Sequence, residues 1–114
     1  MSSRIEERRQ HQRYEIENSV SVTPQGVFQI TDISKGGFCL KCPPYTSVSL
    51  KWVTDILTPI TDLKECLVEK AWAAVHENGN AHLPAIITVG VQFGSLTQDQ
   101  TSSLTKLIDS IQPS

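Results

Sequence analysis

Two groups of residues in this sequence have the types and spacing needed to bind a nucleotide. The four arginines all fall within the first thirteen residues: Arg4, Arg8, Arg9 and Arg13. A second group begins nineteen residues after the last arginine: Asp32, Ser34, Gly36 and Gly37. Arginine forks bind phosphates and the guanine edge, and an ionised aspartate accepts the N–H donors of guanine. Together they predict a ligand that is both a phosphate diester and a purine.

The spacing within each group favours a convergent site. Arg9 and Arg13 are four residues apart, which places them on one side of a strand and as neighbours on a helix. Asp32 and Ser34 are two apart at the end of a predicted strand and therefore share a face. Gly36-Gly37 can adopt positive φ, so we expect a sharp turn there that lets the backbone approach a ligand closely.

One feature of the predicted strand conflicts with this arrangement. Phe28 and Ile30 have the same parity as Asp32 and Ser34, so a regular strand would point apolar and ligand-binding side chains the same way. A β-bulge would resolve the conflict, and so would a strand whose end leaves the core. The sequence does not distinguish these alternatives.

Most of the chain has the two-residue period of β-strands, and only its end has the period of a helix. Strands are predicted over residues 16–22, 27–34, 38–42, 48–52, 65–76 and 87–93. Residues 54–63 are ambiguous, because Pro59 favours a loop or a bent edge strand. A helix is predicted over about residues 97–111, and Thr97 and Gln100 fit a capping box at its start. The pattern predicts an all-β fold, a small antiparallel barrel or sandwich covered by a C-terminal helix.

The composition limits the class of protein. A length of 114 residues with 39% apolar composition is enough for one domain, which we expect over residues 15–114. Residues 1–14 are charged and have almost no apolar residues, so we expect a flexible arm there. A formal net charge of −2 argues against binding long DNA or RNA. We find no signal-peptide pattern and no apolar segment suited to membrane insertion. Three cysteines, an odd number, favour a reducing environment, so the chain is expected to be cytoplasmic.

Other kinds of chemistry are disfavoured by the sequence. Cys39 and Cys42 would point to opposite faces of a strand, and no second cysteine or histidine pair completes a metal site. Ser34 lacks a nearby histidine to act as its base, so we do not expect an enzyme. Trp52 and Trp72 are expected to pack in the core.

The two motifs together resemble those of a known family. Arg8-Arg9-Gln10-His11-Gln12-Arg13 followed by Asp32-Ile33-Ser34-Lys35-Gly36-Gly37 resembles the signature of the PilZ domain, an RxxxR arm and a [D/N]xSxxG turn. The late strand Gly90-Val91-Gln92-Phe93 looks like the family's Gly-hydrophobic-x-Phe pattern, and a helix follows it. The resemblance covers about residues 8–111.

The resemblance implies a six-stranded β-barrel that binds cyclic di-GMP, a bacterial second messenger. By position, Arg9 and Arg13 would grip guanine and phosphate, and Asp32 and Ser34 would hold a guanine. Gly36 belongs to the same turn, and Gly37 would shape it. Arg8 would add a contact or help to hold a stacked pair of ligand molecules. Gln92 departs from the pattern, because many members have a basic residue there.

We therefore expect a receptor or adaptor that needs no cofactor besides its ligand. Binding would order the N-terminal arm onto the barrel and signal in trans to an unidentified effector protein, in processes such as motility or biofilm formation. An alternative is a PilZ-like protein-interaction module that does not bind nucleotide. A general RNA-binding barrel is disfavoured by the acidic balance of the chain. A homodimer is compatible with the sequence.

Overall fold

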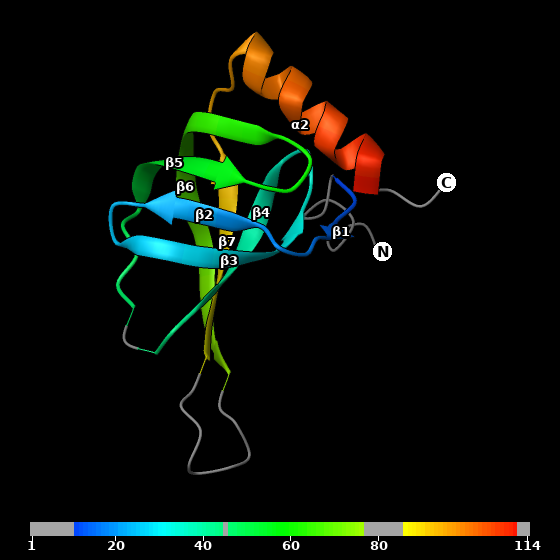
Figure 1. The fold of residues 1–114 in the computed structure, drawn as a ribbon. Helices are drawn as coiled ribbons and strands as arrows, with labels where there is room; N and C mark the ends of the chain where they lie inside the picture. Colours follow the sequence, from blue (N-terminus) through cyan, green and yellow to red (C-terminus); the bar gives the residue numbers. More distant parts are fainter. Residues whose placement is uncertain (1–10, 45, 77–85, 112–114) are drawn as a thin grey trace, which may run out of the picture.

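The computed structural model describes residues 11–44, 46–76 and 86–111. These contain seven strands and a helix: β1 (Tyr14–Glu15), β2 (Val20–Thr23), β3 (Gly26–Ile33), β4 (Gly37–Cys42), β5 (Lys51–Leu57), β6 (Asp62–His76), β7 (Ile86–Phe93) and α2 (Gln98–Ile111). Figure 1 shows the strands wrapped around one core, with α2 lying across one end of them. The β6–β7 hairpin extends beyond the opposite end.

Strands β2 to β7 form a closed antiparallel barrel. They are hydrogen-bonded in the order β3-β2-β5-β6-β7-β4, and pairing of β3 with β4 closes the sheet. The short strand β1 lies outside the barrel and pairs with the end of β3, Tyr14 with Ile33 and Glu15 with Asp32. The prediction of a six-stranded β-barrel with a C-terminal helix is therefore confirmed, with one added outer strand.

The start of the chain differs from its predicted course. Residues 16–22 were expected to form one strand, but β1 ends at Glu15 and β2 starts only at Val20. Asn18, which lies between them, has a φ of 54°, a left-handed conformation that interrupts an extended strand. Tyr14, which was predicted to lie in the arm, belongs to β1 and packs against the core.

The hydrophobic core is formed by inward-facing residues of strands β3 to β7, together with Ile16 and residues of helix α2. Residues with no exposed surface include Ile30, Ile33, Leu40 and Ile56. Burial of such a side chain contributes about 1.5–3 kcal/mol to stability. The core also contains Trp52, as predicted.

Strand β5 begins later than predicted and ends inside the ambiguous segment. Leu50 precedes it and is 72% exposed, so the prediction of a half-buried strand from Val48 was wrong for this residue. A turn over Thr58–Thr61 joins β5 to β6, and the Thr58 hydroxyl accepts N–H bonds from Ile60 and Thr61. Pro59 therefore lies in a loop between two regular strands, where its missing N–H costs no ladder bond.

Helix α2 has the predicted start and a side-chain anchor to the barrel. The Gln100 side chain accepts from the Thr97 N–H at 2.8 Å, and the Thr97 hydroxyl accepts from the Gln100 N–H at 3.1 Å. This reciprocal pair is the predicted capping box. The Gln100 amide also donates to the Lys64 carbonyl at 2.7 Å, which ties the helix to β6. Leu104, Leu107 and Ile108 are buried against the barrel.

Within the described segments, no helix has the length and apolar character needed to cross a bilayer.

Candidate functional site

A β-bulge in β3 turns Asp32 away from the core. In the β3–β4 ladder, Ile30 pairs with Leu40 and Asp32 pairs with Cys39, so Thr31 is an extra residue. The bulge changes the parity of the strand, and Ile30 and Ile33 are both fully buried while Asp32 is half-buried. Of the two ways to resolve the parity conflict, the structure shows the bulge.

Beside this bulge the surface is hollowed into a cleft of about 960 Å³. Its floor is formed by residues of β4, β6 and β7, and its rim by His11, Arg13 and the turn before β4. It is lined by His11, Arg13, Asp32, Ser34, Gly36, Gly37, Phe38, Cys39, Ala71, Trp72, Gly90, Val91, Gln92 and Phe93. The volume lies at the upper end of the range typical of small-molecule sites.

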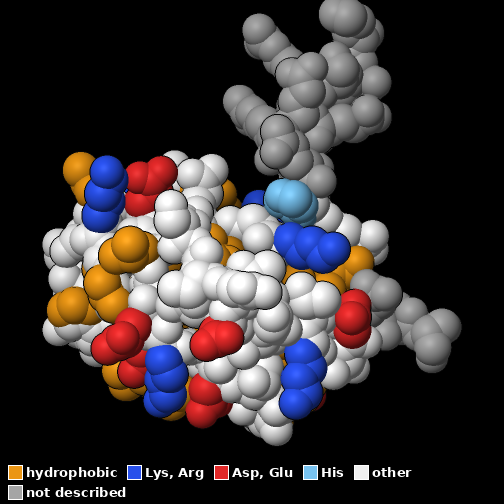
Figure 2. Space-filling view, turned by 90° about the horizontal axis from the view of Figure 1, so that it is seen from above, with side chains coloured by type: hydrophobic (Ala, Val, Ile, Leu, Met, Phe, Trp, Pro, Cys, Tyr) orange, Lys and Arg blue, Asp and Glu red, His pale blue; other side chains and the backbone are white. Residues whose placement is uncertain are grey.

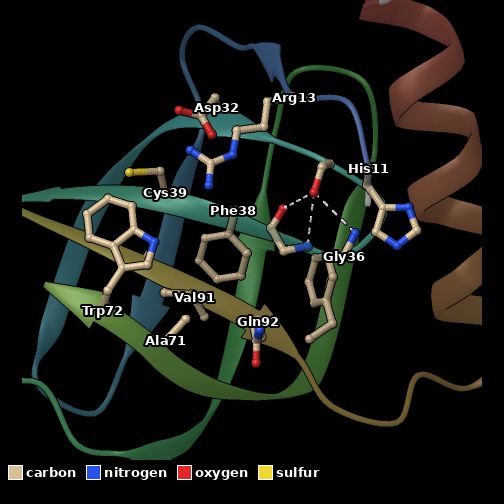
Figure 3. A pocket seen from close by; sticks show the side chains of 14 residues that line it. His11, Arg13, Asp32, Gly36, Phe38, Cys39, Ala71, Trp72, Val91 and Gln92 are labelled. Carbon is tan, nitrogen blue, oxygen red and sulfur yellow. Dashed lines mark hydrogen bonds between the residues drawn. The ribbon is translucent and has the colours of Figure 1, made fainter. Parts of the chain in front are cut away.

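The cleft brings together five of the seven predicted site residues: Arg13, Asp32, Ser34, Gly36 and Gly37. Arg8 and Arg9 lie outside the described residues. Figure 3 shows the Arg13 guanidinium and the Asp32 carboxylate on the same side of the cleft. The pairing of β1 with β3 explains this placement. Glu15 lies opposite Asp32, and Arg13 directly precedes β1, so the ladder holds Arg13 close to the bulge. A cation and an acceptor thus lie together at one end of the cleft.

The Ser34 side chain holds the turn that borders the other end. Its hydroxyl accepts from the N–H groups of Gly36 at 3.1 Å and Gly37 at 3.2 Å, and donates to the Gly37 carbonyl at 3.3 Å. Figure 3 shows these bonds as dashed lines. Because the turn uses the hydroxyl in both directions, Ser34 shapes this rim of the cleft by fixing the backbone of the turn.

Of the two glycines of the turn, Gly37 is needed for space, and neither has a positive φ. Within the described residues, the one glycine with positive φ is Gly26, so the turn at Gly36-Gly37 forms without the positive φ that these residues could adopt. A Cβ on Gly37 would overlap the backbone carbonyl of Val91, which leaves room for glycine alone. A Cβ on Gly36 would lie 2.8 Å from Cδ2 of His11, a side chain that packs over the turn.

Trp72 is a site residue that was not predicted. It was expected in the core, but it is 40% exposed and lines the cleft. The register of β6 shifts between Lys70 and Trp72, and the indole lies over Gly90 of β7, where a Cβ would collide with it. A glycine inside a strand often marks a close approach of another group, so Gly90 was the signal in the sequence.

The cysteines lie as the strand pattern predicted. Cys39 borders the cleft, whereas Cys42 belongs to the core cluster. Burial raises the pKa of the Cys39 thiol, and the nearby Asp32 carboxylate raises it further. Burial also raises the pKa of Cys66 to about 11. Such thiols stay protonated at neutral pH and are weak nucleophiles.

Two comparisons with known proteins concern the sequence alone. No family model matches this sequence. No curated protein matches it either.

Solved structures do resemble this fold. A structure described as the PilZ domain with c-di-GMP of YcgR from Escherichia coli superposes with a TM-score of 0.70 at 11% identity, covering 91% of each chain. MrkH, described as a c-di-GMP-dependent transcription regulatory factor, gives a TM-score of 0.68 at 18% identity. This match covers 93% of the present chain and 52% of MrkH, so the chain spans about half the length of MrkH. The chain has the fold of a PilZ domain.

Proposed function

We propose that this chain is a cyclic di-GMP receptor. The observation that carries the proposal is the placement of Arg13 and Asp32 together at a cleft bordered by the Ser34–Gly37 turn. The similar YcgR structure is described as a PilZ domain with c-di-GMP, which supports the same ligand class for this cleft.

The chemistry of the cleft fits the two halves of such a ligand. The Arg13 guanidinium would donate two parallel hydrogen bonds to a phosphate or to guanine O6 and N7. The Asp32 carboxylate would accept from the N–H groups on the other edge of guanine. Arg8 and Arg9 would add positive charge from the arm and meet the remaining phosphate.

Trp72 extends this assignment to the face of the base. A purine that lies in the cleft presents an aromatic face, and the partly exposed indole offers a surface on which it can stack. Stacking of a base on an aromatic side chain is worth about 1–3 kcal/mol. The site would therefore hold a guanine by its edge at Asp32 and by its face at Trp72.

Surface charge supports a small anionic ligand over a nucleic acid. On the face seen in Figure 2, lysine and arginine side chains are interspersed with aspartate and glutamate and form no continuous basic surface. Proteins that bind long nucleic acids need such a surface to neutralise many phosphates. A small ligand needs only the local cations beside the cleft.

Signalling would follow from ordering of the arm. When Arg8, Arg9 and Arg13 close over the ligand, the surface around the cleft changes, and an effector protein in the cytoplasm would bind the new surface. We propose that this signal acts in motility or biofilm formation. No catalytic step is part of the proposal.

A second function is favoured by one residue. Gln92 lines the cleft at a position where many PilZ domains carry a basic residue, which weakens the case for an anionic ligand. The rival is a protein-interaction module that binds no nucleotide. Thermal unfolding with cyclic di-GMP, GTP and cyclic di-AMP separates the two. A receptor is stabilised by cyclic di-GMP alone, whereas the rival shows the same melting temperature with all three.

A further inference from the structure

The end of β6 forms a strand edge that no described residue covers. Strand β5 pairs with β6 as far as Lys51 opposite Glu69, and the Lys70 N–H donates to the Leu50 carbonyl at 2.8 Å. Beyond this point, β6 continues to His76 and pairs only with β7, on its other side. Figure 1 shows this part of the hairpin projecting past the barrel. Ala71–His76 therefore presents alternate backbone N–H and C=O groups that can pair with another strand.

The sequence of this edge lacks the features that normally prevent pairing. Ala71-Trp72-Ala73-Ala74-Val75-His76 contains no lysine, glutamate, aspartate or proline. Apart from His76, its side chains are small or apolar, and Val75 is 64% exposed. Natural proteins usually protect a long edge with a charge, a proline or a covering segment. An edge without them is suited to an interface.

We propose that this edge pairs with the same edge of a second copy of the chain, which makes an antiparallel β6–β6 dimer about a two-fold axis. In such a pairing, two residues that lie opposite each other are an even number of positions apart in the sequence. The two-fold axis therefore passes midway between the two copies of one residue. An axis through Ala73 or Ala74 places an alanine against its own copy, where no steric or charge conflict arises. The segment has no lysine, arginine or acidic side chain and is thus its own antiparallel complement.

The proposed dimer also adjoins the cleft. Trp72 lies both in the cleft and in the edge strand, so the partner's strand would run along the rim of the candidate binding site. The proposal itself requires no ligand and is tested without one. A failure to dimerise would leave the proposed cyclic di-GMP binding unaffected, and the converse also holds.

Sedimentation velocity of the ligand-free chain over rising concentration tests the proposal. Because six residues per chain form only a small interface, we expect a weak dimer that dissociates on dilution. Val75→Lys adds a charge at an exposed position of the edge and should give a monomer at every concentration. Val27→Lys is the matched control, because Val27 is 60% exposed on β3 and lies outside the edge, and it should still dimerise.

A cysteine placed at the axis gives a second, positive test. Ala73→Cys or Ala74→Cys should form an intermolecular disulfide under mild oxidation, whereas Val27→Cys should not. A wild-type chain that stays monomeric up to about 1 mM would overturn the proposal. A dimer that survives Val75→Lys and forms no disulfide at either alanine would do so equally.

Discussion

The indole of Trp72 on β6 occupies the space into which a side chain at Gly90 on β7 would project. The largest side chain of the cleft therefore packs over one of its three glycines. This arrangement keeps the ring against the sheet and leaves Trp72 40% exposed toward the cleft. The tryptophan and the glycine act as one unit that presents an aromatic surface to a ligand.

Replacing the tryptophan tests this role directly. Trp72→Ala should weaken cyclic di-GMP binding about 5- to 150-fold, the range that corresponds to loss of one stacked base, and Trp72→Phe should retain most of the affinity. Gly90→Ala should also weaken binding by displacing the indole. If the glycine acts through the tryptophan, the Trp72→Ala/Gly90→Ala double variant loses no more affinity than Trp72→Ala alone. Additive losses in isothermal titration would contradict this coupling.

Arg13 should contribute to ligand affinity and little to the stability of the free protein. It lines the cleft and is not part of the core cluster, so Arg13→Ala should lower affinity at least about tenfold, because a charge-assisted hydrogen bond is worth about 1.5–3 kcal/mol. The melting temperature without ligand should stay that of the wild type. Lys51→Ala removes an exposed cation from β5, outside the cleft, and serves as the control that should bind normally. Equal affinities of the Arg13→Ala and Lys51→Ala variants would exclude Arg13 from the site.

The two adjacent glycines of the turn should respond differently to substitution. Gly37→Ala forces a methyl group against the Val91 carbonyl, which belongs to the barrel ladder and cannot move alone. We expect the free energy of unfolding to fall by about 1–3 kcal/mol, the usual cost of overpacking. Gly36→Ala meets only the His11 side chain, which can rotate, so it should cost less. Urea unfolding of both variants checks the order, and a larger loss for Gly36→Ala would show that the contacts are misassigned.

The buried thiols make stability depend on alkaline pH. Burial raises the pKa of Cys66 from 9.0 to about 11. Below pH 9.0 the thiol is protonated in both folded and unfolded chains, so its full contribution is present. As pH rises from 9.0 through about 11, the unfolded chain ionises first, and the free energy of unfolding falls by up to about 3 kcal/mol. Urea unfolding at several pH values should show this loss, and Cys66→Ala should show less of it. An identical pH profile in the variant would rule out Cys66 as the cause.

The fold could be predicted well because its periodic signals are local. Alternation in residues 38–42 and 87–93 and the helical stripe of Leu104, Leu107 and Ile108 each identify an element without reference to the rest of the chain. The early strands were less predictable. The break at Asn18 depends on a left-handed residue, and the exposure of Leu50 depends on where β5 begins to pair, and neither leaves a periodic signal.

The candidate site could be predicted only as far as its motifs extend. One cleft brings together five predicted residues, as their spacing suggested: Arg13, Asp32, Ser34, Gly36 and Gly37. A bulge in β3 makes this possible, and it was one of the two alternatives that the sequence offered. Trp72 was missed because alternation alone cannot tell an inner from an outer face once the register shifts at Ala71. The requirement for glycine at position 37 could not be predicted either, because it arises from the Val91 carbonyl of β7, which is far away in the sequence.

Isothermal titration of the purified chain with cyclic di-GMP, with GTP and cyclic di-AMP as controls, tests the central claim most directly. The account predicts selective binding of cyclic di-GMP at micromolar or better affinity, which is lost in the Arg9→Ala/Arg13→Ala double variant. Absence of heat with the wild-type chain, together with no thermal stabilisation at high ligand concentration, would contradict it. The fold would then serve contacts with a protein partner that do not depend on a nucleotide.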